Sequence, residues 1–339
     1  MQDKLTKIRD LFQQDVGNRG LAKIPEANLI TACANDYFTA CQSLTETKNL
    51  SVAIVTGFFI PHGQPSCGES DGPPGAVYLA KAIIELGGQA CLLTDAFCQN
   101  ALEVGVREVG LQDVVPVRVF LENRAGWPDY LKLHLMPFLR NERKLTHLIT
   151  IERVGPNHTE ESLRSQLSSE EEMLVQEYVT NVPEDQQDRC YNASGKDITD
   201  LNSPSHLLFD YVRQKFSDIV TIGIGDGGNE LGMGKIPWPI IRNNIKGGAK
   251  LACRVSTDHL IVAGISNWGA YGLAIGALLQ SGRAFHRDSF SVESESNCLQ
   301  AMMEKGPLVD GVTGKPTLSV DTVPLERYLQ TLREMTALL

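Results

Sequence analysis

The stretch Thr221-Ile-Gly-Ile-Gly-Asp-Gly-Gly-Asn-Glu-Leu-Gly-Met-Gly-Lys235 decides how this chain is expected to fold. A short apolar run ends in a glycine-rich loop that carries Asp226, Asn229, Glu230 and Lys235. Glycine loses the most backbone entropy on folding, so a dense cluster after a strand indicates positive φ angles or close approach to a ligand. Two carboxyl groups, an amide and an amine in the same loop indicate a chemical role.

Apolar strands and helices alternate along the rest of the chain. We expect strands at 51–56, 89–94, 114–120, 147–152, 219–224, 251–255 and 259–263, and helices at 5–12, 26–44, 73–86, 96–109, 129–141, 203–216, 268–279 and 325–338. This alternation is typical of a mostly parallel sheet with helices on both faces. The prediction is a doubly wound, Rossmann-like α/β fold in a single domain spanning 1–339. An acidic, Ser- and Gln-rich segment at about 157–188 is interpreted as an insertion or flexible flap.

Polar residues follow several of the predicted strands, and ligands of open parallel sheets bind beyond the carboxyl ends of the strands. The candidates are Glu69, Asp71 and Gly72 after the first strand, Glu152 and Arg153 at the fourth, Asp226, Asn229, Glu230 and Lys235 in the glycine-rich loop, and Asn267 after the last strand. Simpler interpretations exist for two of these groups. Asp71 precedes a proline-initiated helix and would serve as an N-cap worth ~1 kcal/mol. Glu152 and Arg153 would form an ordinary surface ion pair.

The segment Gly223–Gly228 also fits the dinucleotide pattern G-x-G-x-x-G. A pyrophosphate would be repelled by Asp226 and Glu230, and no acidic ribose partner stands ~20 residues later. We therefore expect no organic cofactor. The acids could instead hold Mg²⁺ or Mn²⁺ through Asp226 and Glu230, or supply a general acid and a general base with separated pKa values. Spacing alone leaves both open.

Composition limits the partners of the 339-residue chain. Its formal charge is −10 with no basic block, so nucleic acid and anionic membranes are not expected to bind. No apolar run reaches the ~20 residues of a membrane helix. Eight cysteines without a CxxC pair indicate reduced, intracellular thiols. Cys67, in the loop of glycines and prolines, is a minor candidate for a nucleophile.

Several collinear motifs resemble the C-terminal catalytic domain of vertebrate D-glutamate cyclase and its stand-alone relatives. They are Asp15–Gly20, Thr56–Phe58, Glu69–Ala76, Ile151–Arg153, Tyr191–Ala193, Thr221–Lys235 and Ile261–Tyr271. The vertebrate enzymes have an additional N-terminal domain. They also carry Thr where this chain has Ser70, and Tyr where it has Cys190, so an essential Tyr at position 190 is excluded here.

The resemblance implies a lyase that converts D-glutamate to 5-oxo-D-proline and water, in the mitochondrial matrix, or in the cytoplasm for a stand-alone homologue. Homo-oligomerisation is left open. From the motifs we expect acid–base roles for Asp226, Glu230, Glu69, Asp71 and Glu152, and substrate binding by Arg153, Lys235, Asn229, Gly72, Asn267 and Arg19. Two other classes stay open: a metal-dependent hydrolase or isomerase of another small carboxylate, and a non-catalytic module that binds an acidic amino acid.

Overall fold

A six-stranded parallel sheet forms the centre of the computed structural model, which describes residues 1–339. Its strands run in the order β5-β4-β1-β6-β7-β8, so the chain order reverses between β1 and β6. This is the strand order of doubly wound dinucleotide-binding folds, and the predicted fold class is confirmed. The strands are β1 (Ser51–Thr56), β4 (Gln89–Thr94), β5 (Val117–Val119), β6 (His147–Ile151), β7 (Val220–Gly225) and β8 (His259–Val262).

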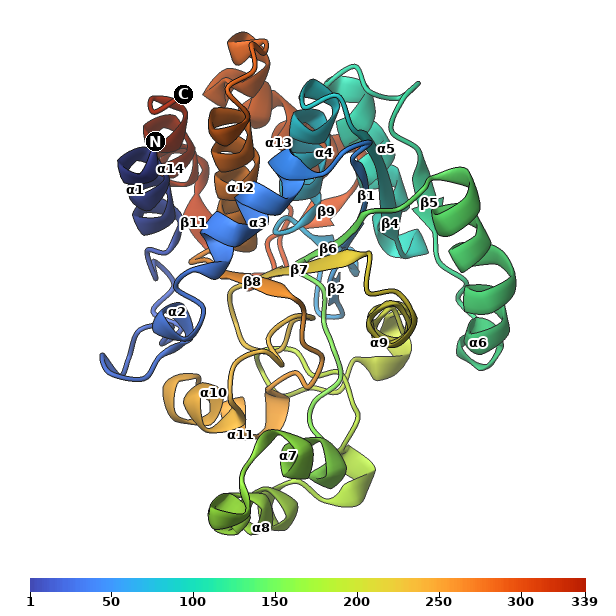
Figure 1. The fold of residues 1–339 in the computed structure, drawn as a ribbon, viewed down its shortest axis with the longest axis vertical. Coiled ribbons are helices and arrows are strands. Elements are labelled where there is room, and N and C mark those ends of the chain that lie inside the picture. Colours follow the sequence, from blue (N-terminus) through green and yellow to red (C-terminus); the bar gives the residue numbers. More distant parts are fainter.

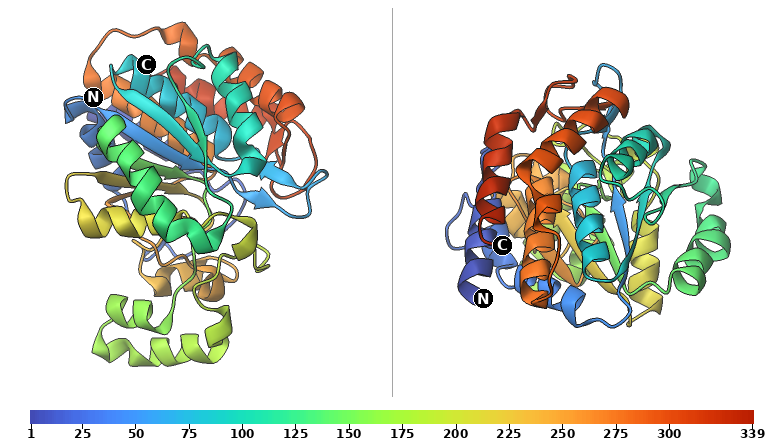
Figure 2. Two further views of the ribbon diagram at one scale, coloured as in Figure 1. Left: turned by 90° about the vertical axis from the view of Figure 1, so that its right-hand side faces the viewer. Right: turned by 90° about the horizontal axis from the view of Figure 1, so that it is seen from above.

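Helices cover both faces of this sheet (Figures 1 and 2). Side chains of a strand alternate between faces, so Val52 and Ile54 of β1 enter one core, and Ala53 and Val55 enter the other. The first core is closed by α1 (Gln2–Phe12), α3 (Asp36–Glu46), α4 (Pro73–Glu85), α5 (Ala96–Glu108), α12 (Ser266–Ser281), α13 (Val292–Lys305) and α14 (Leu325–Thr336). The second is closed by α2 (Leu29–Ala32), α6 (Trp127–Tyr130), α7 (Glu160–Gln166), α8 (Glu172–Asn181), α9 (His206–Lys215), α10 (Trp238–Asn244) and α11 (Gly248–Leu251).

Short strands extend the fold beside the carboxyl ends of the main sheet. A three-stranded sheet joins β2 (Phe59–Ile60), β3 (Cys67–Glu69) and β9 (Leu308–Val309), and a small hairpin joins β10 (Ser319–Val320) and β11 (Val323–Pro324). These strands bring the loop after β1 next to a segment near the C-terminus. None of the helices is both long and apolar enough to cross a membrane.

Two predicted elements are split or absent, and one observed helix was not predicted. The expected helix at 26–44 is split, because the side chain of Asn28 caps α2 and a turn separates it from α3. The expected strand at 251–255 is absent: α11 ends at Leu251, and the following residues form only isolated bridges along the glycine-rich loop. α13 was not predicted, because its first half is polar.

The acidic segment at 157–188, which we interpreted as an insertion or flexible flap, contains two α-helices. α7 and α8 project at the bottom of Figure 1. Tyr178 of α8 packs edge-on against Trp238 of α10, and Glu177 pairs with Arg242. These contacts bury one side of an otherwise polar helix and hold the segment on the second core.

Candidate active site

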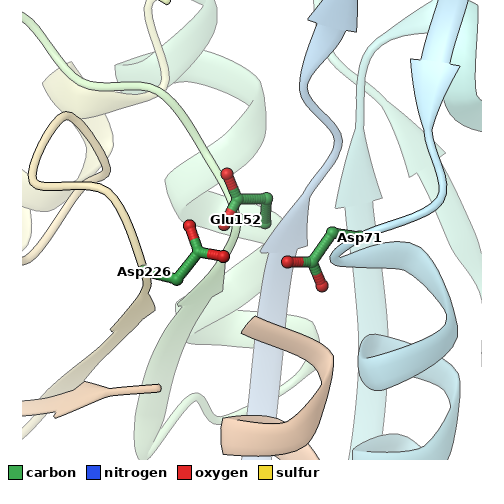
Figure 3. A group of neighbouring side chains, drawn as sticks. All are labelled: Asp71, Glu152 and Asp226. Atoms are coloured by element: carbon green, nitrogen blue, oxygen red, sulfur yellow. The ribbon is translucent and has the colours of Figure 1, made fainter. Parts of the chain in front are cut away.

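Three buried carboxyl groups meet where the chain order of the sheet reverses. Glu152 follows β6, Asp226 follows β7, and Asp71 lies in the loop between β3 and α4. Each offers one oxygen, and these oxygens all lie within 4.8 Å of one another. The three side chains point toward a common centre from three separate segments (Figure 3). The predicted convergence of these acids at one edge of the sheet is therefore observed.

Two helices begin at this cluster, and each is capped from the loop of the other. Asp71 accepts hydrogen bonds from the backbone amides of Ser266 (2.8 Å) and Asn267 (2.7 Å) at the start of α12. The side-chain oxygen of Asn267 in turn accepts from the amides of Gly72 (2.9 Å) and Gly75 (2.8 Å) at the start of α4. The backbone amides at the start of both helices thus find hydrogen-bond acceptors within the protein. The amide of Gly72, a predicted substrate contact, is occupied by Asn267.

The glycine-rich loop is organised by its own glutamate. The carboxylate of Glu230 accepts hydrogen bonds from the amides of Asp226 (3.2 Å), Gly227 (2.7 Å) and Gly228 (2.8 Å). Gly228 has a φ of +93°, which explains the need for glycine at this turn. Both oxygens of Glu230 are used in this way, so the structure gives it a positioning role where we expected a catalytic residue or metal ligand.

An arginine from the N-terminal loop joins two acids at the cluster. Asp15 accepts hydrogen bonds from the amides of Arg19, Gly20 and Leu21 and so shapes this loop. The guanidinium of Arg19 then lies 2.6 Å from Asp226 and 2.6 Å from Asp321.

Sequence analysis missed Asp321, which lies in the turn between β10 and β11 with no strand or glycine signal nearby. Asp310 positions this turn by accepting from the Ser319 hydroxyl and the Thr322 amide, both at 2.7 Å.

A cavity of about 410 Å³ opens beside the cluster. Of the predicted residues, Glu69, Glu152, Arg19 and Asn229 line it, whereas Asp71, Asp226, Glu230 and Asn267 are buried behind its wall. Its lining also contains residues that sequence analysis missed: Asp321, Lys246, His62, Asn192 and Ser194. For Lys246 a signal existed, since it precedes the pair Gly247-Gly248 in a loop.

Burial of so many acids strongly favours their protonated forms. Burial raises the pKa of Glu69 well above its usual value, and the neighbouring Glu152 raises it further. Burial likewise raises the pKa of Glu152, with Glu230 and Asp71 adding to the shift and Arg19 opposing it. Burial raises the pKa of Asp71 to about 8, although the amides of α12 oppose the shift. These neighbouring acids therefore cannot all be ionised together.

The other two predicted cations lie outside the cavity. Arg153 is fully buried, and its guanidinium pairs with Asp95 and donates to the carbonyl oxygens of Gly57 and Ser203 and the hydroxyl of Ser205. Lys235 pairs with Asp36, 2.5 Å away, on the far side of the glycine-rich loop. Neither side chain has a free donor facing the cavity, so the expected anchoring of substrate by these residues is not supported.

The carboxylates match the hard oxygen ligands that Mg²⁺ and Mn²⁺ prefer. Asp226 Oδ2 is buried and has no hydrogen-bond partner, while Glu152 accepts only from the Ser266 hydroxyl, at 2.5 Å. The donor set that fits a divalent cation best is Asp226, Glu152 and Asp71, whose oxygens lie within 4.8 Å of one another, although both oxygens of Asp71 also accept hydrogen bonds from the start of α12. Glu230, which we predicted as a ligand with Asp226, is not part of this group, and its oxygens hold the loop.

Comparisons with known proteins show the family of this chain. A family model described as D-glutamate cyclase-like, C-terminal, matches residues 8–336. The chain is also 28% identical over 285 residues to a human protein named D-glutamate cyclase, mitochondrial. That alignment covers 84% of this chain and 40% of the human protein, so the chain spans about two fifths of the relative's length. With a family model matched over almost its whole length, the chain belongs to the D-glutamate cyclase-like C-terminal family.

Proposed function

We propose that the protein is a D-glutamate cyclase, a lyase that closes D-glutamate to 5-oxo-D-proline with release of water. The observation that carries this proposal is the presence of Glu69 and Glu152 in the wall of one cavity, both buried, with Glu152 close enough to raise the pKa of Glu69. Family membership and the name of the human relative support the choice of substrate.

The proton balance of the reaction suits two carboxyl groups. The substrate ammonium must lose two protons in all, and the departing γ-carboxylate oxygen must gain two to leave as water. One ionised carboxylate takes the first proton and frees the amine to attack the γ-carbon. The second carboxyl group, which starts protonated, donates its proton to the γ-oxygen. It then takes a proton from the nitrogen, while the first carboxyl group protonates the hydroxyl that leaves as water. Both carboxyl groups return to their starting states, and the C–N bond has replaced a C–O bond.

The surroundings favour one assignment of these roles. Burial raises the pKa of both glutamates and Arg19 lowers both, so these effects do not distinguish them. Glu152 accepts a hydrogen bond from the Ser266 hydroxyl, which stabilises its ionised form, whereas no donor contacts the carboxyl group of Glu69, so Glu69 is the group that keeps the proton. We assign Glu152 as the base and Glu69 as the acid.

Asp226, Asp71 and Arg19 set the electrostatic surroundings of the two glutamates. Because Asp226 and Asp71 lie behind the wall, they act on the substrate through Glu152 and Arg19.

A divalent cation held by Asp226, Glu152 and Asp71 would supply a Lewis acid for the γ-carboxylate. Proton transfer by Glu69 and Glu152 does not require it. The test is turnover by chelator-treated protein shown to be metal-free by elemental analysis. Full activity would leave acid–base catalysis alone, and recovery only with added Mg²⁺ or Mn²⁺ would establish the metal.

A chromatographic assay for 5-oxoproline, with D-glutamate and L-glutamate in parallel, tests the proposed activity. Formation of 5-oxo-D-proline from D-glutamate supports it. Binding of D-glutamate without turnover would identify a binding module, and turnover of another small carboxylate would identify a different enzyme. Because the human relative is named as mitochondrial, we also propose a mitochondrial site of action, to be checked by fractionation.

A further inference from the structure

The cavity contains one cation that no carboxylate of the protein neutralises. Its wall carries three acids, Glu69, Glu152 and Asp321, and two side chains of basic type on long stems, Arg19 and Lys246. Arg19 is held by Asp226 and Asp321. Lys246 forms no ion pair or side-chain hydrogen bond, although it lies in the lining. The imidazole of His62 has a partner, the carbonyl oxygen of Val312, 3.3 Å away.

Lys246 comes from a different loop than the three acids. It follows α10 and precedes Gly247, whose φ of +75° turns the chain into α11. Ile245 and Leu251, on either side of it, also line the cavity. The cavity therefore has acids from the ends of β3, β6 and β10, and a single free cation from the α10–α11 loop.

This division matches the chemistry of a folded dicarboxylic amino acid. In the proposed reaction the amine and the γ-carboxyl group react with each other, so both must lie at Glu69 and Glu152. The α-carboxylate takes no part and keeps its charge throughout. Close to three acids it would be repelled unless a cation binds it. We propose that Lys246 binds the α-carboxylate and thereby sets the orientation of the substrate; this inference rests on the proposed function.

The test compares two substrates that differ only at this group. D-Glutamate carries the α-carboxylate, and D-isoglutamine has a neutral carboxamide in its place while keeping the γ-carboxylate. For K246A we expect KM for D-glutamate to rise by about 10- to 100-fold, as loss of a charged hydrogen bond predicts, with kcat changed only a few-fold. KM for D-isoglutamine should not change. Lys246→Arg should restore most of the affinity for D-glutamate.

Lys250→Ala is the matched control, because it removes a nearby lysine whose ammonium lies 4.3 Å from the ring centre of Tyr191 and which does not line the cavity. Equal effects of K246A on both substrates, or no effect on either, would overturn the assignment. Calorimetric binding of the two compounds to wild type and K246A gives the same comparison without turnover. A protein that binds D-glutamate through Lys246 but forms no 5-oxoproline would therefore refute the proposed activity and leave the anchor intact.

Discussion

Glu152 has a φ of +44°, in the left-handed region that residues other than glycine rarely adopt. Such a conformation costs about 1–3 kcal/mol and persists only where its surroundings impose it. Here Gly72 approaches so closely that a Cβ atom added to it would lie 2.9 Å from Glu152 Cβ and 2.6 Å from Thr56 Oγ1. The side chain is also held by the Ser266 hydroxyl. Glu152 is therefore fixed by its neighbours in a conformation that a strand end would not otherwise choose.

Replacing either glutamate of the cavity wall by its amide should stop proton transfer while keeping the shape of the site. We expect E152Q and E69Q each to lower kcat by ~100-fold or more, the usual effect of losing an acid or base. The same scale is expected for D226N, because it removes the charge that holds Arg19. The control is V312A, which shortens an apolar residue of the same lining that has no proton to exchange. Wild-type rates in E152Q and E69Q, measured with correctly folded protein, would contradict the assigned roles.

The pH dependence of the wild-type enzyme follows from the same pair. At low pH both glutamates are protonated and no base remains, so kcat/KM falls as pH falls. At high pH both are ionised and no acid remains, so the rate falls as pH rises. Because burial raises the pKa of both groups, the rising limb should lie above the usual carboxyl pKa of 4.5. A rising limb near the usual value, or one unchanged in E152Q with residual activity, would show that another group titrates.

Arg153 illustrates a buried cation whose role is structural. Removing one partner of a buried ion pair leaves an uncompensated charge and costs about 3–5 kcal/mol. We expect R153A to lose stability on this scale, because Asp95 would be left unpaired, and urea unfolding measures the loss. Arg164→Ala, which removes an exposed arginine paired with Glu160 and Glu172, should have a much smaller effect on stability, because solvent screens exposed ion pairs. A stable R153A with a raised KM would restore the role in substrate anchoring.

Among the elements, the loop from β9 to β10 lies outside the main sheet and fixes the position of Glu69, the proposed catalytic acid. Gly311 lies against Glu69 so closely that an added Cβ would stand 1.8 Å from Glu69 Oε2. The same loop leads to Asp321 through the hydrogen bonds of Asp310. The position of the catalytic acid thus depends on a segment about 240 residues later in the chain (311 − 69 = 242).

A methyl group at position 311 tests this contact without changing any charge. G311A should displace the Glu69 carboxyl group and lower kcat by ~10-fold or more, as expected when a reacting group is misplaced by about 1 Å. Stability should change less than activity, since the loop lies at the surface. V312A is the control, because it shortens the neighbouring exposed side chain and adds nothing near Glu69. Equal activity in both variants would indicate that the position of Glu69 is unimportant.

For the whole molecule, sequence analysis predicted the sheet better than the site. Buried parallel strands are apolar on both faces, so they stand out as continuous runs, and five of the six central strands were placed within about two residues. The strand ends also led to Glu69, Asp71, Glu152 and Asp226. Which candidate residues face the cavity and which are buried in the interior could not be predicted. Glu230 and Arg153, for example, have structural roles because neighbouring groups in the fold form hydrogen bonds or ion pairs with them. Asp321 and Lys246 were missed because both come from loops brought in by tertiary packing.

A second buried polar group affects the stability of the molecule as a whole. Glu295 of α13 accepts a hydrogen bond from the Tyr271 hydroxyl, which also contacts the hydroxyl of Tyr328. Burial raises the pKa of Glu295 to about 8, above the 4.5 of an exposed glutamate, with Lys81 opposing the shift. The folded state binds the proton of Glu295 more tightly than the unfolded state does. This proton binding therefore stabilises the folded state fully below pH 4.5. That effect is lost as pH rises from 4.5 to about 8.

Glu295→Gln removes this proton binding. Between pH 5 and pH 8.5 the free energy of unfolding of the wild type should fall more than that of E295Q, by a few kcal/mol, since each pKa unit corresponds to about 1.4 kcal/mol. Chemical denaturation at the two pH values measures the difference. Glu293→Gln, at an exposed position of the same helix, should follow the wild type. Parallel pH profiles for wild type and E295Q would show that Glu295 is already ionised at pH 5.

The pair formed by Arg19 and Asp321 joins residues 302 positions apart (321 − 19 = 302), and the two chain ends lie side by side in Figure 1. During synthesis on the ribosome, Asp321 is made 302 residues after Arg19. Until then the arginine has only Asp226 to bind, and the cavity lacks one wall. Proteolytic removal of the segment that carries Asp321 would return the molecule to that condition. Activity of this protein therefore reports that the segment carrying Asp321 has been made and kept.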